Sequence, residues 1–119
     1  MRKHPSSVVD RMRILGPERL AVSVITALEL REGAEMSSHP VEYHRRIDVF
    51  LEYIRPLALP VGAAKDGAEI RYRLRKAGKP IGDFDSLIAA HALHLNLVLV
   101  SNNLREFSRI PDLKTENWV

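Results

Sequence analysis

Two acidic residues open a strongly apolar segment in the second half of the chain. Asp83 and Asp85 precede residues 87–93, which are almost entirely apolar up to His94. A helix of this composition must be largely buried, so its first turn holds both carboxylates in place. Such carboxylates accept free backbone N–H groups and favour the positive end of the helix dipole. Capping accounts for one of them, and the other is a candidate metal ligand.

A third candidate carboxylate lies near the front of the chain. Glu29 follows the apolar run 20–24 by one helical turn, and its helical neighbours four residues away are Ile25 and Gly33. These neighbours do not belong to a freely solvated helix face. The alternative is a half-exposed glutamate that pairs with Arg31 or Arg105.

Polar residues also follow the apolar run 97–100. Ser101, Asn102 and Asn103 come directly after it, and Glu106 is three residues further on. Side chains at a strand end can hold water, a metal-bound ligand or a phosphate, although asparagine also favours ordinary turns. In an open α/β sheet, ligands gather outside the carboxyl ends of the strands, so we expect all these groups at one rim.

Carboxylates at one rim suit Mg²⁺, which binds through few carboxylates together with substrate phosphate, and they suit Mn²⁺ equally. The chemistry would be metal-assisted hydrolysis of a phosphodiester bond. A zinc site is disfavoured, because His91 and His94 have no third ligand nearby and the chain has no cysteine. No glycine-rich phosphate loop or nucleophile elbow occurs.

Helices alternate with short apolar strands along the 119 residues, which predicts one α/β domain. The expected strands are 20–24, 57–61, 97–100 and a final short edge strand in 113–119. The run 97–100 is typical of a strand covered on both faces near the centre of a parallel sheet. Helices are expected from Pro5 to Gly16, over 26–36, after Pro40, over 63–77 with Gly78 as cap, and over 85–95. The helix after Pro40 would turn one apolar face to the core: Val41, Ile47, Phe50, Leu51 and Ile54.

The net charge of +3 permits nucleic-acid binding without requiring it. Basic residues crowd 2–13 and 71–79, although a charge run is more often a solvated helix face. No apolar run has the length of a signal peptide or a membrane span, so we expect a cytoplasmic protein. A DNA-binding regulator is disfavoured, since no helix-turn-helix pattern carries the basic residues.

Four segments together resemble PIN-domain ribonucleases of the VapC toxin type over essentially the whole chain: SVITALELREG (23–33), PIGDFDSLIAAHA (80–92), VSNNLREF (100–107) and TENW (115–118). The resemblance implies a three-layer α/β domain with a central parallel sheet flanked by helices. It also implies an endoribonuclease that depends on Mg²⁺ or Mn²⁺ and is the toxin of a toxin-antitoxin module. Its partners would be an RNA substrate, in some members a tRNA, a cognate antitoxin and a second copy of the chain.

By position, the resemblance assigns metal binding and catalysis to Glu29 and Asp85. Asp83 is a neighbour that the family motif does not require. The family's fourth position falls on Asn103, which lacks a negative charge, and Glu106 is close enough in sequence to compensate.

The front of the chain departs from the family pattern, which begins with a strand ending in aspartate. Residues 1–7 cannot form that strand, and Asp10 lies in the helical register of Val9 and Met12. We therefore expect residues 1–119 to be a single PIN-like domain that lacks its first strand and first catalytic carboxylate, and to cleave little RNA. Met1 would then be an internal methionine of a longer natural protein. The alternative is a non-catalytic relic that binds an antitoxin or another partner.

Overall fold

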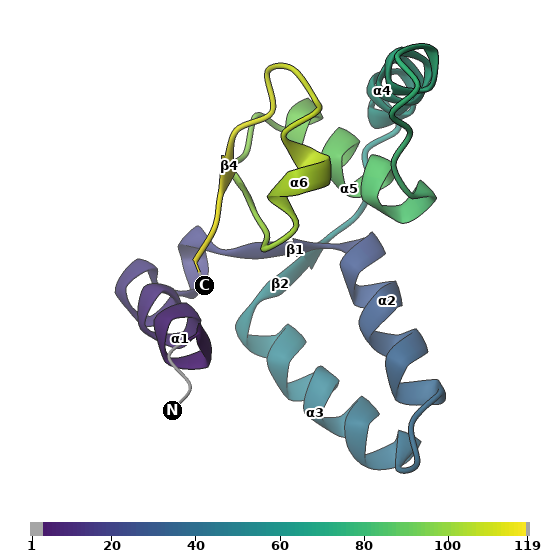
Figure 1. Ribbon diagram of the computed structural model, residues 1–119. Helices are drawn as coiled ribbons and strands as arrows, with labels where there is room; N and C mark the ends of the chain where they lie inside the picture. Colours follow the sequence, from purple (N-terminus) through teal and green to yellow (C-terminus); the bar gives the residue numbers. More distant parts are fainter. Residues whose placement is uncertain (1–3, 119) are drawn as a thin grey trace. The chain divides into compact units, whose positions relative to one another are not determined.

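The computed structural model describes residues 4–118, in two compact units. One unit contains Val9–Ala58, and the other contains the described residues from Leu59 onward together with residues 4–8. Each is described by itself below, with the elements labelled in Figure 1. No helix within residues 4–118 has both the length and the apolar character needed to cross a membrane.

The unit 9–58 is a helical hairpin joined to a short parallel strand pair (Figure 1). Helix α1 (His4–Leu15) ends at Gly16, whose φ of 81° suits glycine. After the 3₁₀ turn Pro17–Arg19 come β1 (Ala21–Ser23), α2 (Val24–Glu35), α3 (Pro40–Tyr53) and β2 (Arg55–Leu57). Strands β1 and β2 pair in parallel, with Ala21 opposite Arg55. Arg31 fastens α2 to α3, because its guanidinium contacts Asp48 at 2.6 Å.

The unit from Leu59 onward is built on two packed helices, α4 (Ala63–Lys76) and α5 (Asp83–His94). Helix α4 is followed by Gly78, which has the positive φ of 74° expected of a terminating glycine. Strand β3 (Leu99–Val100), helix α6 (Leu104–Phe107) and strand β4 (Thr115–Glu116) complete the unit. Strands β3 and β4 pair in parallel, with Leu99 opposite Thr115.

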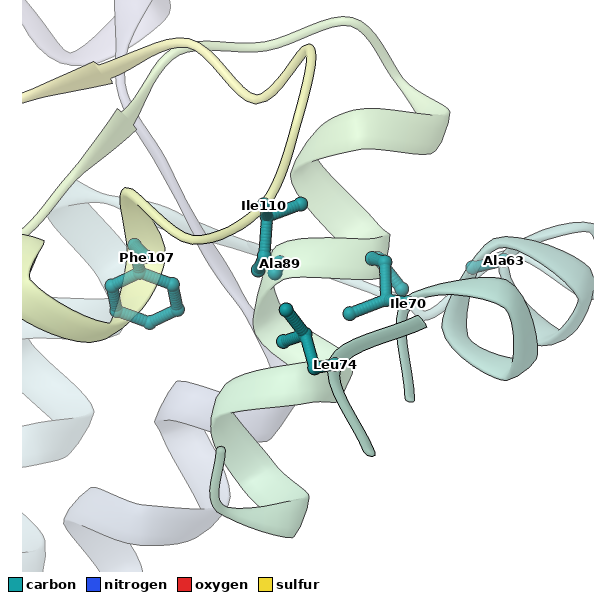
Figure 2. Packing of buried hydrophobic residues seen from close by; sticks show 7 residues of the cluster. Ala63, Ile70, Leu74, Ala89, Phe107 and Ile110 are labelled. Carbon is teal, nitrogen blue, oxygen red and sulfur yellow. The ribbon is translucent and has the colours of Figure 1, made fainter. Parts of the chain in front are cut away.

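The core of this unit lies between α4, α5 and the segment after β3 (Figure 2). Small residues bring the two helices close together: Ala89 and Ala90 are fully buried, and a Cβ on Gly67 would lie 3.5 Å from the Cβ of Ala90. Larger apolar side chains fill the space around them, namely Ile70, Leu74, Phe107 and Ile110. This packing fixes the axis of α5, and therefore the position of its first turn.

The predicted α/β class with parallel strand pairing is confirmed, and every predicted helix is present. Three details of the prediction were wrong. The second strand is Arg55–Leu57 rather than 57–61, since the end of α3 at Tyr53 leads directly into pairing with β1. Val41 does not face the core, being 73% exposed in the first turn of α3.

The third wrong detail is the covered, central position expected for residues 97–100. Strand β3 has only two residues and belongs to a two-stranded sheet with β4. Leu97, Val98 and Val100 are 43%, 47% and 41% exposed. An apolar run shows that a strand suits burial, but its sheet neighbours decide how much of it is covered.

Candidate active site

The first turn of α5 is tied to α4 through one arginine. Arg71 Nη1 contacts Asp83 Oδ1 at 2.6 Å and donates to Ser86 Oγ at 3.1 Å. Ser86 is fully buried, and its hydroxyl donates to the backbone carbonyl of Asp83 at 2.7 Å. The carboxylate of Asp83 is therefore engaged in an ion pair, which leaves Asp85 as the candidate metal ligand of the acidic pair.

Asp85 is half-buried, and its carboxylate has no hydrogen bond or ion pair with the part of the chain that the structure describes. Burial raises the pKa of Asp85, and the negative charge of Glu106 raises it further. Capping by either carboxylate, the alternative drawn from the sequence, is not observed within residues 4–118, since neither accepts a backbone N–H bond there. Asp85 is thus a desolvated acid whose ionisation a nearby cation would favour.

Glu106 provides the second carboxylate at this place. It lies half-buried on α6, and its negative charge contributes to the raised pKa of Asp85. Asn103 donates from Nδ2 to Glu106 Oε2 at 3.0 Å, and its own backbone N–H donates to Ser101 Oγ at 2.9 Å. Asn103 therefore orients the carboxylate of Glu106 through this hydrogen bond. The turn after β3, which contains Ser101 and Asn103, thus positions an acidic side chain in addition to its own polar groups.

Gly82 leaves space beside the carboxylate of Asp85. Its φ of −61° and ψ of 156° suit any residue, so the backbone does not require glycine here. A Cβ at this position would lie 3.9 Å from Asp85 Oδ2. The absence of a side chain at residue 82 keeps one flank of the carboxylate open to a cation or a substrate.

Glu29 belongs to the other unit, where it is exposed on α2. Arg31, one of the two arginines that the sequence offered as a partner for Glu29, contacts Asp48 and donates to the carbonyl of His44. The assignment of Glu29 as a metal ligand stays a prediction.

The donor set of the unit from Leu59 onward fits a hard divalent ion. Asp85 and Glu106 offer carboxylate oxygens that form no ion pair within the described residues, and Gly82 leaves room beside Asp85. In the described residues 4–118, no three His, Cys, Asp or Glu side chains converge as a metal cluster. Two carboxylates are what Mg²⁺ commonly takes from a protein when substrate phosphate completes its shell. His94, one of the two histidines considered for zinc, pairs through Nδ1 with Asp66 at 2.8 Å.

Sequence reasoning missed two residues that shape this site, Arg71 and Ser86. Arg71 was assigned to a solvated basic face. Its helical neighbours at minus four and plus three, Gly67 and Leu74, are both buried, so Arg71 lies at the margin of the packed face. That spacing was the signal available in the sequence. Ser86 offered a weaker one, as a polar residue within the first buried turn of an apolar helix.

Known proteins resemble the chain closely. The family model described as PIN domain matches residues 1–113. The tRNA(fMet)-specific endonuclease VapC of Shigella flexneri is 37% identical over 118 residues, which cover 99% of this chain and 89% of the relative. Ribonuclease VapC2 of Haemophilus influenzae is 40% identical over 119 residues, covering 100% of this chain and 89% of that protein.

Solved structures agree with this relationship. VapBC2 from Rickettsia felis, bound to a DNA fragment from its promoter, matches with a TM-score of 0.91 and 34% identity over 99% of this chain and 90% of that one. DNA-bound VapBC from Salmonella typhimurium matches with a TM-score of 0.90 and 36% identity over 95% of this chain and 85% of that one. The chain therefore belongs to the PIN-domain family, as a ribonuclease of the VapC type.

Proposed function

We propose that this protein is a metal-dependent endoribonuclease, the toxin of a toxin-antitoxin module, and that Asp85 and Glu106 form the centre of its active site. The observation that carries the proposal is that both carboxylates are half-buried, and that burial, and then the negative charge of Glu106, raises the pKa of Asp85. Asp83, the other acid of the motif, is already neutralised by Arg71. Within the described residues, Asp83 therefore has a positive partner and Asp85 does not.

Asp85 and Glu106 would hold Mg²⁺ or Mn²⁺. When bound, such an ion activates a water molecule and neutralises the charge that develops on the leaving oxygen during phosphodiester hydrolysis. Asn103 limits the rotation of Glu106 through its 3.0 Å hydrogen bond. Arg71 and Ser86 keep the first turn of α5, and with it Asp85, in a fixed position. Glu29 is proposed as a further ligand on the family resemblance alone.

The proposed substrate is RNA, with tRNA as the class to test first. Support comes from the Shigella flexneri relative, which is named a tRNA(fMet)-specific endonuclease. Recognition of a folded RNA usually reads shape and unpaired bases, so loops and stems of tRNA should be compared as separate substrates.

The proposed protein partner is a cognate antitoxin. Support comes from the solved structures that match the chain, which are described as VapBC assemblies. A homodimer and a cytoplasmic location complete the proposal and rest on the family resemblance. Co-expression with a VapB-type antitoxin from the same genome, followed by size-exclusion chromatography with light scattering, tests the partner and the copy number together.

A second candidate is a non-catalytic binding module of the same family. It is favoured by one observation, that Asn103 is neutral where the family has an acid and only hydrogen-bonds Glu106. Such a module would bind a partner but would have no use for a divalent ion.

Titration with Mn²⁺ separates the two candidates. Metal binding is measured first, because it reports on the proposed ligands without the choice of an RNA substrate. A ribonuclease should bind Mn²⁺ at a site that Asp85→Asn abolishes and that Asp10→Asn, an exposed control on α1, leaves intact. Cleavage of tRNA by the protein isolated from its own cells should follow the same pattern. Absence of Mn²⁺ binding, or equal binding by both variants, would establish the binding module instead.

A further inference from the structure

A small hollow lies between α4 and the loop that leads into α5. Six residues line its volume of about 170 Å³: Arg71, Leu74, Arg75, Pro80, Ile81 and Asp83. Since a water molecule takes up about 30 Å³ of liquid, the hollow has room for several waters or for one phosphate group. All of its lining belongs to the unit from Leu59 onward.

The charge of this hollow is positive. Arg71 and Asp83 neutralise each other at 2.6 Å. Arg75 is exposed, and its guanidinium has no hydrogen bond or ion pair with any residue that the structure describes. One uncompensated guanidinium therefore faces solvent at the rim, and its planar group of N–H donors matches the geometry of a phosphate.

Part of the backbone that lines this hollow is held in place by hydrogen bonds. Arg109 Nη1 donates to the carbonyl of Pro80 at 3.3 Å, which fastens the loop to the segment after α6. Lys79 N–H donates to the carbonyl of Leu74 at 2.8 Å in the turn that ends α4. A hollow bounded by fastened backbone loses little conformational entropy when a ligand enters.

The hollow also adjoins the proposed active site. Asp83 lines the hollow and is the first residue of α5, so Asp85 follows within the same helical turn. Between them Phe84 is 39% exposed, although large aromatic side chains usually find cover. Proteins that bind single-stranded nucleic acid combine cationic side chains with exposed aromatic rings, which stack on the bases.

We propose that this hollow is a phosphate subsite for the RNA strand, in which Arg75 binds a backbone phosphate next to the one cleaved at Asp85 and Phe84 stacks on the intervening base. The inference rests on the proposed function, because it assumes that RNA passes Asp85. An acidic peptide would satisfy Arg75 but would make no use of the exposed ring. The observations therefore favour RNA.

The test is the binding of a fluorescein-labelled single-stranded RNA, followed by anisotropy in EDTA over a series of salt concentrations. All proteins carry Asp85→Asn, so that no RNA is cleaved, and circular dichroism checks that each variant is folded. Arg75→Ala should weaken binding and reduce the magnitude of the salt slope by about 0.7, the value for one phosphate contact on a single strand. Phe84→Ala should weaken binding about fivefold or more without changing that slope.

Arg73→Ala is the matched control, an exposed arginine on the same helix that does not line the hollow. Equal losses for Arg75→Ala and Arg73→Ala would overturn the subsite, because the effect would then be general charge. A poly-glutamate peptide that loses as much affinity as RNA in Arg75→Ala would also overturn it, in favour of a peptide site. RNA binding is measured in EDTA, so it does not depend on bound metal. A negative result in this test would overturn the phosphate subsite without affecting the Mn²⁺ titration, and a negative Mn²⁺ titration would not affect the interpretation of RNA binding.

Discussion

Arg71 contacts the carboxylate of Asp83 at 2.6 Å, and this contact separates two neighbouring acids into different roles. The positive partner of Asp83 is a side chain of the protein itself, Arg71. Asp85, two residues later, lies half-buried beside Glu106 and has no such partner in the described part of the chain. An ion pair with a neighbouring helix therefore leaves one carboxylate of the motif to bind an external cation.

The first prediction contrasts these two acids. Asp85→Asn should abolish Mn²⁺ binding, whereas Asp83→Asn should retain it, because the carboxylate of Asp83 already forms an ion pair with Arg71. Asp83→Asn should lower the free energy of unfolding by no more than about 1 kcal/mol, since the pair is exposed on its acidic side. Isothermal titration with Mn²⁺ and urea unfolding of both variants measure these effects. Loss of Mn²⁺ binding in Asp83→Asn would show that Asp83 is itself a ligand.

The second prediction concerns the buried hydroxyl that joins the two helices. Ser86→Ala removes the donor to the Asp83 carbonyl and the acceptor for Arg71. We expect it to lower the free energy of unfolding by about 1–3 kcal/mol, the cost of leaving buried polar groups unsatisfied. Ser108→Ala, an exposed serine whose hydroxyl bonds the Arg105 carbonyl at 3.4 Å, is the control and should change stability by less than about 0.5 kcal/mol. Equal effects of the two substitutions would contradict the structural role of Ser86.

The third prediction follows from the raised pKa of Asp85, whose ordinary value is 3.8. A carboxyl group whose pKa is higher in the folded than in the unfolded state favours folding when it is protonated. Its contribution is therefore present below the ordinary value and is lost as pH rises through the raised pKa. In the absence of metal, Asp85→Asn should be more stable than the wild type at pH 7, and the two should converge at about pH 3. Urea unfolding from pH 3 to 7 in EDTA measures the difference, and Asp10→Asn is the control.

Added Mn²⁺ should reverse that order. The ion stabilises only the folded protein that binds it, so the wild type should gain stability with Mn²⁺ concentration and Asp85→Asn should not. A wild-type protein that is more stable than Asp85→Asn at pH 7 even in EDTA would contradict the raised pKa.

The fourth prediction concerns Asn103. Its hydrogen bond to Glu106 restrains a proposed ligand from behind, and loss of such outer contacts typically costs about 10–100-fold in metal affinity. Asn103→Ala should therefore weaken Mn²⁺ binding by about tenfold, while Asn102→Ala, an exposed neighbour, should leave it unchanged. The comparison is made by titration calorimetry. Unchanged binding in Asn103→Ala would remove Glu106 from the proposed ligand set.

The sequence predicts the helices of this protein well, because their signals are local. The run of spaced apolar residues in 63–77 and the glycine at 78 define α4 to within one residue. The apolar composition of α5 predicts its burial, and six of its residues are indeed buried. Strands were predicted less well. Their extent depends on pairing with distant segments, as the displacement of β2 to Arg55–Leu57 shows.

In the candidate site, too, the features set by local sequence were predictable and those set by tertiary packing were not. Asp85 was recognisable from its place at the head of an apolar helix, since that place is set by local sequence. The neutralisation of Asp83 was not, because its partner Arg71 lies 12 residues earlier on another helix. Likewise, nothing local shows that Asn103 bonds Glu106 and that the charge of Glu106 acts on Asp85. Such relations arise only when α4, α5 and α6 are packed together.

The close approach of α4 and α5 has a consequence for how this protein can vary. A Cβ on Gly67 would touch Ala90 at 3.5 Å, and one helical turn away Arg71 spans the same gap to Asp83. Larger side chains at positions 67 or 90 would widen the gap and draw the arginine off the acid. A substitution in the core that seems to change only side-chain volume would then break the ion pair at the first turn of α5. Substitutions in the interior of this unit and changes in the charge of the proposed active site are therefore expected to occur together in evolution.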